Sequence, residues 1–142
     1  MAKRECEDWL RFSRDDLESA VFLLGLAPRK IEIICYHCQQ CAEKALQAIS
    51  AFFDEEISRS HDLRSLLRAG VRHFPALESL MEVLAELQPY AVAVRYPYEI
   101  EVVSGDEERA IENARKTLAK IEGELRLFLA SDGRVYSTRS IP

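Results

Sequence analysis

Cysteine and histidine residues gather in one short stretch, which is the first candidate for chemistry. Cys35, Cys38 and Cys41 follow one another at three-residue steps, and His37 lies four residues before Cys41. Zinc prefers thiolate and imidazole ligands, so the stretch could hold a metal ion. On a single helix, however, steps of three residues spread the thiols over roughly 120°, and they do not converge tetrahedrally. We therefore interpret Cys35 and Cys38 as small buried residues that permit close helix packing, and we predict no metal site.

A ladder of basic residues is the second candidate. Arg64, Arg68 and Arg72 are spaced four residues apart, and His61 precedes them. On a helix these arginines share one flank, where guanidinium groups can bind phosphate through paired hydrogen bonds. A solvated face whose arginines pair with nearby carboxylates is the more common meaning of such a pattern. The sequence leaves both interpretations of the ladder open.

An arginine among tyrosines is the third candidate. Arg95 lies five residues after Tyr90 and is followed by Tyr96 and Tyr98. Arginine supplies a fixed positive charge, while phenol rings can stack on bases or donate hydrogen bonds. Alternatively, Arg95 caps a helix end or pairs with Glu43, and the tyrosines fill one end of a helical bundle. The sequence leaves both interpretations open.

Other common chemistries are disfavoured. The chain has no Gly-rich dinucleotide loop, no Walker motif, no metalloprotease motif and no hydrolase nucleophile motif. No strand-like segment precedes the cysteines, as a thioredoxin-type redox site would need. We therefore expect no cofactor.

Length and composition set the frame for these residues. The chain has 142 residues, of which 48% are hydrophobic and 30% charged, and its formal net charge is −5. These values predict one globular domain and argue against bulk electrostatic coating of nucleic acid, although a local basic patch remains possible. No apolar run suits a membrane span, and the charged N-terminus does not resemble a signal peptide. We expect a cytoplasmic protein with reduced cysteines.

Apolar residues at three- and four-residue steps predict helices along almost the whole chain. Asp62 is expected to cap one helix, and Ser104 with Glu107 forms a capping-box pattern before the last. Pro89 is expected to kink or end the fourth helix. The fold class is therefore all-α, an up-and-down bundle of four to five helices in one domain over residues 1–130, with a loose tail over 131–142. The helices are expected at about 5–26, 30–53, 62–73, from 75 onward, and from about 104 to 130.

The ordered set of these residues resembles the HEPN domain family (higher eukaryotes and prokaryotes nucleotide-binding) over about residues 5–129. The resemblance lies in Trp9 with Asp16-Leu17 and Ala20, the run 36–46, His61-Asp62-Leu63, and Tyr90 with Arg95-Tyr96-Pro97. It implies an all-α bundle, usually a homodimer, often encoded beside a minimal nucleotidyltransferase. In many such pairs the HEPN protein is an RNA-cleaving toxin and its partner is the antitoxin.

The catalytic form of the family carries an arginine followed after four to six residues by a histidine. Arg95 matches the arginine, but residues 96–102 contain no histidine. Because histidine suits proton transfer near neutral pH, its absence favours a non-catalytic protein. The resemblance then implies nucleotide or RNA binding, with these residues as candidates: Arg95, Tyr96, Tyr90, His61, His37, Gln40 and Lys44.

Two further hypotheses stay open. One is a metal-independent ribonuclease toxin in which Arg95 works with a histidine from outside the motif, for which His61 is the candidate. The other is a non-catalytic homodimeric interaction module whose dimer seam is the last helix, with its apolar residues over 111–128, or an exposed face of the bundle.

Overall fold

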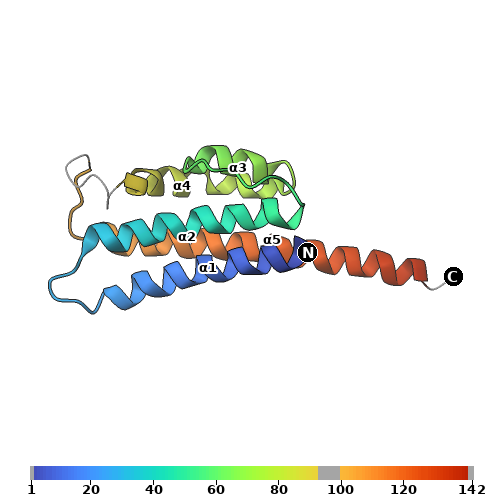
Figure 1. Ribbon diagram of the computed structural model, residues 1–142, viewed down its shortest axis with the longest axis horizontal. Coiled ribbons are helices and arrows are strands. Elements are labelled where there is room, and N and C mark those ends of the chain that lie inside the picture. The colour runs from blue at the N-terminus through green and yellow to red at the C-terminus, as the bar shows by residue number, and fades with distance from the viewer. Residues whose placement is uncertain (1, 93–99, 141–142) are drawn as a thin grey trace.

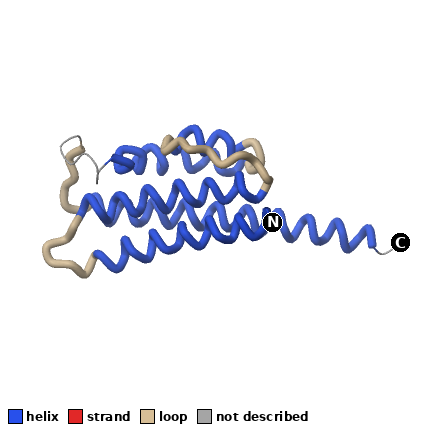
Figure 2. Tube along the Cα trace, viewed as in Figure 1, coloured by secondary structure: helices blue, strands red, loops and turns tan. Residues whose placement is uncertain are grey.

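The computed structural model describes residues 2–92 and 100–140, with side chains over 3–92 and 100–131. All regular structure in these ranges is helical, which confirms the predicted fold class (Figure 2). The helices are α1 (Ala2–Leu23), α2 (Ile31–Phe52), α3 (Leu63–Val71), the 3-10 helix η1 (Pro75–Leu80), α4 (Met81–Leu87), the 3-10 helix η2 (Gln88–Val92) and α5 (Asp106–Ser140).

Helix α2 is the centre of the bundle. It packs against α1, α5 and α3, and Figure 1 shows it between α1 on one side and α3 with α4 on the other. Most of its side chains are consequently buried, including Cys35, Cys38 and Cys41. The interpretation of these cysteines as packing residues is confirmed. At Cys41 the approach of α1 is close, since the Ser13 hydroxyl donates to the Cys41 carbonyl at 2.7 Å.

The thiols should therefore be inert in the folded protein. Burial raises the pKa of Cys6 to about 11 and the pKa values of Cys35 and Cys41 to about 12. We expect an aromatic disulfide reagent at pH 8 to modify all four cysteines at least about 100-fold more slowly than in denaturant, since the thiolate is the nucleophile. The absorbance of the released thiol measures both rates. One thiol reacting at the denatured rate would contradict this burial.

The apolar seam of α5 is used inside the bundle. Ile111, Leu118, Ile121 and Leu125 are buried, whereas Phe128 is 40% exposed. Most of the seam that we considered for a dimer interface is thus already covered by the chain's own core. The buried part of the seam is not accessible to a second copy, whereas Phe128 at its end is.

The start of α5 differs from its prediction. The helix begins at Asp106, whose carboxylate accepts from the Val103 amide at 2.9 Å, and Glu107 accepts from the Gly105 amide at 2.8 Å. The capping box that we predicted, with Ser104 as the cap, is therefore wrong. Gly105 has φ 102, a backbone conformation that glycine adopts readily, and this turn shifts the helix start past Ser104.

Proline shapes the segment before the undescribed residues. The single helix predicted from Pro75 is divided into η1, α4 and η2. The α-helix ends at Leu87, two residues before Pro89, which confirms the predicted stop. Pro89 has no amide hydrogen, so the α-helical ladder cannot continue and tightens into a 3-10 turn.

The C-terminal end of α5 extends beyond the bundle (Figure 1). The helix continues to Ser140 through the segment that the sequence predicted as a loose tail. The domain boundary near residue 130 stays a prediction. Among the described residues, none of the helices has the length and apolar character that a membrane span requires.

Candidate functional site

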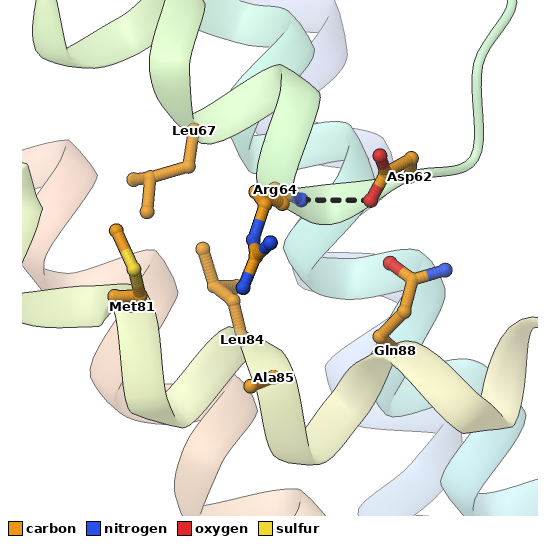
Figure 3. Close-up of a pocket in the computed structure, with 7 residues that line it drawn as sticks. All are labelled: Asp62, Arg64, Leu67, Met81, Leu84, Ala85 and Gln88. Carbon is orange, nitrogen blue, oxygen red and sulfur yellow. Dashed lines mark hydrogen bonds between the residues drawn. The ribbon is translucent and has the colours of Figure 1, made fainter.

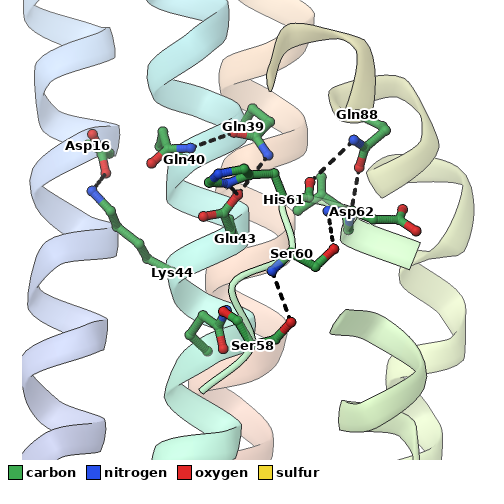
Figure 4. Close-up of polar contacts among 12 residues, drawn as sticks. Asp16, Gln39, Gln40, Glu43, Lys44, Ser58, Ser60, His61, Asp62 and Gln88 are labelled. Atoms are coloured by element: carbon green, nitrogen blue, oxygen red, sulfur yellow. Dashed lines mark hydrogen bonds and ion pairs between the residues drawn. The ribbon is translucent and has the colours of Figure 1, made fainter. Parts of the chain in front are cut away.

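Two polar clusters flank α2, and Figure 4 shows them on opposite sides of this helix. The first faces α1. Asp16 accepts a hydrogen bond from Lys44 Nζ at 2.6 Å, and its other oxygen lies 2.8 Å from His37 Nδ1. Burial would raise the pKa of Asp16, but the hydrogen bonds and charges of His37 and Lys44 outweigh it and lower this pKa below its ordinary value of 3.8. Two of the predicted binding residues thus serve the α1–α2 contact.

The second cluster faces the connector before α3. Nδ1 of His61 lies 2.9 Å from Oε1 of Glu43, and Gln39 donates to the same oxygen at 3.2 Å. Gln40 in turn donates to Gln39 at 2.8 Å (Figure 4). The Glu43 side chain is only 11% exposed, whereas that of His61 is 58% exposed. A buried carboxylate therefore holds one nitrogen of an exposed imidazole.

The other ring nitrogen of His61 is open to a ligand. Within the described part of the chain, Nε2 of His61 has no hydrogen-bond partner. When Glu43 accepts the Nδ1 proton, Nε2 carries a lone pair, and a protonated ring would present a donor there instead. Either form can contact a phosphate or a hydroxyl group.

The backbone around His61 is fixed by neighbouring side chains. Gln88 donates to the His61 carbonyl at 3.3 Å and accepts from the Leu63 amide at 2.6 Å. Asp62 caps α3, as predicted, by accepting from the Arg64 amide at 3.2 Å. The connector and the start of α3 are thus held together, so the position of His61 relative to the arginines of α3 is set by the fold.

The arginine ladder lies on the exposed flank of α3. Arg64, Arg68 and Arg72 are all exposed, and no ion pair involves them among the described residues. The face is solvated, as one interpretation predicted, but the carboxylate pairing that this interpretation included is not found within this part of the chain. We name His61, Arg64, Arg68 and Arg72 together the basic face.

A pocket of about 290 Å³ opens beside the basic face, between α3 and α4 (Figure 3). From α3 and its cap come Asp62, Arg64 and Leu67. From α4 and the residue after it come four side chains at the spacing of one helical face: Met81, Leu84, Ala85 and Gln88. The sequence shows this spacing on α4, but it does not show which residues of α3 lie opposite.

The remaining predicted residues fall elsewhere. Tyr90 is half-buried against the core, and burial, with the nearby Cys35 thiol, raises its pKa above the ordinary value of a phenol. Arg95 and Tyr96 lie outside the described residues, so their roles stay predictions. Within the described ranges, no group of three or more His, Cys, Asp or Glu side chains is placed to hold a metal ion.

The sequence did not point to Gln39 or Gln88, which complete the second cluster. Gln39 lies in the mostly apolar buried stripe of α2, where a polar side chain must find a partner. This is the signal that could have identified it. Gln88 acts across a sequence separation of more than twenty residues, and no local pattern indicates such a bond.

The fold and these clusters define a helical-bundle domain whose central helix carries polar side chains toward both neighbouring layers. The HEPN domain model matches residues 6–124. The chain therefore belongs to the HEPN domain family, which confirms the resemblance stated above.

Two solved structures have the same fold. TT1696 from Thermus thermophilus is 27% identical, with a TM-score of 0.72, and the match covers 83% of this chain and 96% of that one. ST0689, an archaeal HEPN homologue, is 26% identical, with a TM-score of 0.64, and the match covers 84% of this chain and 96% of that one. A search of curated protein sequences finds no match.

Proposed function

We propose that this HEPN protein binds phosphate-bearing ligands, either nucleotides or RNA, on its basic face. The observation that carries the proposal is that Arg64, Arg68 and Arg72 are exposed and have no carboxylate partner in the described chain. His61, whose imidazole Glu43 orients, lies in the connector just before α3. Successive arginines lie about 6 Å apart along the helix, so two of them can reach one phosphate or two neighbouring phosphates.

The chain's net charge of −5 requires that this binding be local. Phosphate contacts made by a few arginines release few counterions, so the affinity should fall with salt, with a modest slope. The acidic remainder of the surface would repel nucleic acid from other faces. Binding should therefore be confined to the basic face.

We further propose that the protein acts with a minimal nucleotidyltransferase, in a pair of the toxin–antitoxin type, and that it forms a homodimer. Both proposals rest on the family. The dimer has additional support from α1, where Phe22 is 80% exposed and Phe12 is 43% exposed. Large exposed apolar side chains are the kind of surface that two copies bury. Sedimentation of Phe22→Asp against the unmodified chain tests this.

The ligand-binding proposal is tested by titrating a labelled single-stranded RNA and a set of nucleotides at two salt concentrations. We expect His61→Ala to weaken RNA binding about 5- to 10-fold, since one hydrogen bond contributes about 1–1.5 kcal/mol net. Circular dichroism should show an unchanged fold, because the His61 side chain is largely exposed. Arg115→Ala on α5, also an exposed position, is the matched control and should bind normally. Absence of RNA and nucleotide binding in the unmodified protein would overturn the proposal.

A metal-independent ribonuclease is the second candidate function. It is favoured by the contact between Glu43 and His61, because a buried carboxylate that orients an exposed imidazole is an arrangement suited to general acid–base catalysis. Arg95 would hold the phosphate. If the protein cleaves RNA and both His61→Ala and Arg95→Ala abolish cleavage, this function replaces plain binding; if the unmodified protein leaves RNA intact, it is excluded.

A further inference from the structure

The pocket between α3 and α4 has apolar walls and a charged mouth. Leu67 and Leu84 are buried and form its walls, while Met81 exposes 38% of its surface. Figure 3 shows these side chains facing the space between the two helices, with Arg64 beside them. An exposed methionine at the rim of a pocket is apolar surface that a bound ligand would cover.

Arg64 is the one charged group of the pocket that is free to bind. The carboxylate of Asp62 already accepts from the Arg64 amide and, at 2.9 Å, from the Ser65 hydroxyl. The side-chain amide of Gln88 is also occupied, because its oxygen accepts from the Leu63 amide and its nitrogen donates to the His61 carbonyl. Among the pocket's described residues this leaves the guanidinium of Arg64 without a partner, and Arg68 is the next arginine along the same flank. The site thus offers an apolar slot with positive charge at its mouth.

The volume and the lining of the pocket limit the class of ligand that it can bind. A volume of about 290 Å³ lies at the small end of the range of roughly 300–1,000 Å³ usual for ligand pockets. Apolar side chains on two sides suit a flat heterocycle, as in proteins that hold single bases. A phosphate joined to that heterocycle through a sugar would lie against Arg64.

We infer that this pocket binds the base of a nucleoside monophosphate, whose phosphate lies on Arg64 with Arg68 adjacent. The inference rests on the proposed function and deepens it, because it assigns the base as well as the phosphate a place. It also predicts different effects for two kinds of variant. Filling the pocket should affect nucleotides, whereas removing arginine charge should affect every phosphate-bearing ligand.

Calorimetric titration with the four common nucleoside monophosphates and with ribose 5-phosphate tests the inference. We expect nucleotides to bind at least 10-fold more tightly than ribose 5-phosphate, which lacks the base. Ala85→Trp, which fills the pocket from α4, should weaken the binding of nucleotides at least 10-fold and leave the affinity for ribose 5-phosphate unchanged. Arg64→Ala should weaken the binding of nucleotides and of ribose 5-phosphate alike. Ala76→Trp, at an exposed position outside the pocket, is the matched control.

Methionine NMR gives a second measurement that needs no substitution. The chain has two methionines, and Met81 is the one that lines the pocket. A bound base should shift the Met81 methyl signal through its ring current, and ribose 5-phosphate should not. Unchanged nucleotide affinity in Ala85→Trp, or an unshifted Met81 methyl at saturation, would overturn the pocket assignment while the proposed function stands. If the unmodified protein binds neither nucleotide nor RNA, the proposed function itself fails.

Discussion

Reversing the charge of the arginine ladder, by Arg64→Glu, Arg68→Glu and Arg72→Glu together, should reduce RNA affinity at least about 100-fold. Each substitution removes a phosphate contact and places a negative charge where the ligand's own charge approaches. The three side chains are exposed and make no ion pair within the described chain, so the fold should survive. Fluorescence anisotropy of a labelled RNA measures the loss, and thermal unfolding checks the fold.

A matched triple variant on α5 separates local from overall charge. Arg115→Glu, Lys116→Glu and Arg126→Glu change the net charge equally and also lie at exposed positions. If phosphates bind on the basic face, this variant should lose affinity only a few-fold through the general field of the protein. Equal losses in the two variants would show that RNA responds to net charge alone and would remove the ladder from the site.

The fold was largely predictable because its signals are local. Apolar side chains at helical spacing indicate the long helices, and proline and aspartate mark several of their ends, as at Pro89 and Asp62. The start of α5 was misplaced because two signals compete there. Ser104 suits a helix cap, but Gly105 adopts a positive φ that interrupts the helical path, and only the folded chain shows which prevails.

The site was predictable in its residue types and less so in its geometry. His61 and the arginines of α3 could be grouped from their proximity in sequence. His37 and Lys44 could not be separated from Gln40 by that reasoning, because all three lie within eight residues on α2. Which flank each side chain takes depends on where α1 and the connector pack. The sequence pattern does not specify that Asp16 binds His37 and Lys44 across the helix interface.

The Asp16 cluster should contribute strongly to stability, and Asp16→Asn is expected to lower the free energy of unfolding at pH 7 by about 2–3 kcal/mol. The Asp16 side chain is 12% exposed, and its two oxygens accept from His37 and Lys44 separately, so asparagine removes the charge and leaves one of these two donors facing an NH2 group in a poorly hydrated place. Asparagine keeps the size of the side chain, so no cavity contributes to the difference. Urea unfolding followed by circular dichroism measures the difference.

The pH dependence gives the same cluster an independent signature. Because the pKa of Asp16 in the folded state lies below its ordinary value of 3.8, the folded protein binds this proton less readily than the unfolded chain. The ionised Asp16 therefore contributes fully to the free energy of unfolding above about pH 5, and this contribution is lost as the pH falls through the pKa of the folded state. The gap in stability between the unmodified protein and Asp16→Asn should narrow over that acid range.

Asp15→Asn is the matched control for both measurements, since Asp15 is the neighbouring aspartate and is exposed. It should change the stability by less than about 0.5 kcal/mol, as surface substitutions usually do. If Asp16→Asn is as mild as this control at pH 7, or if its gap to the unmodified protein stays constant down to pH 3, the ion pairs do not hold α1 to α2. The α1–α2 contact would then depend on apolar packing and on the close approach at Cys41, where Ser13 donates to the backbone of α2.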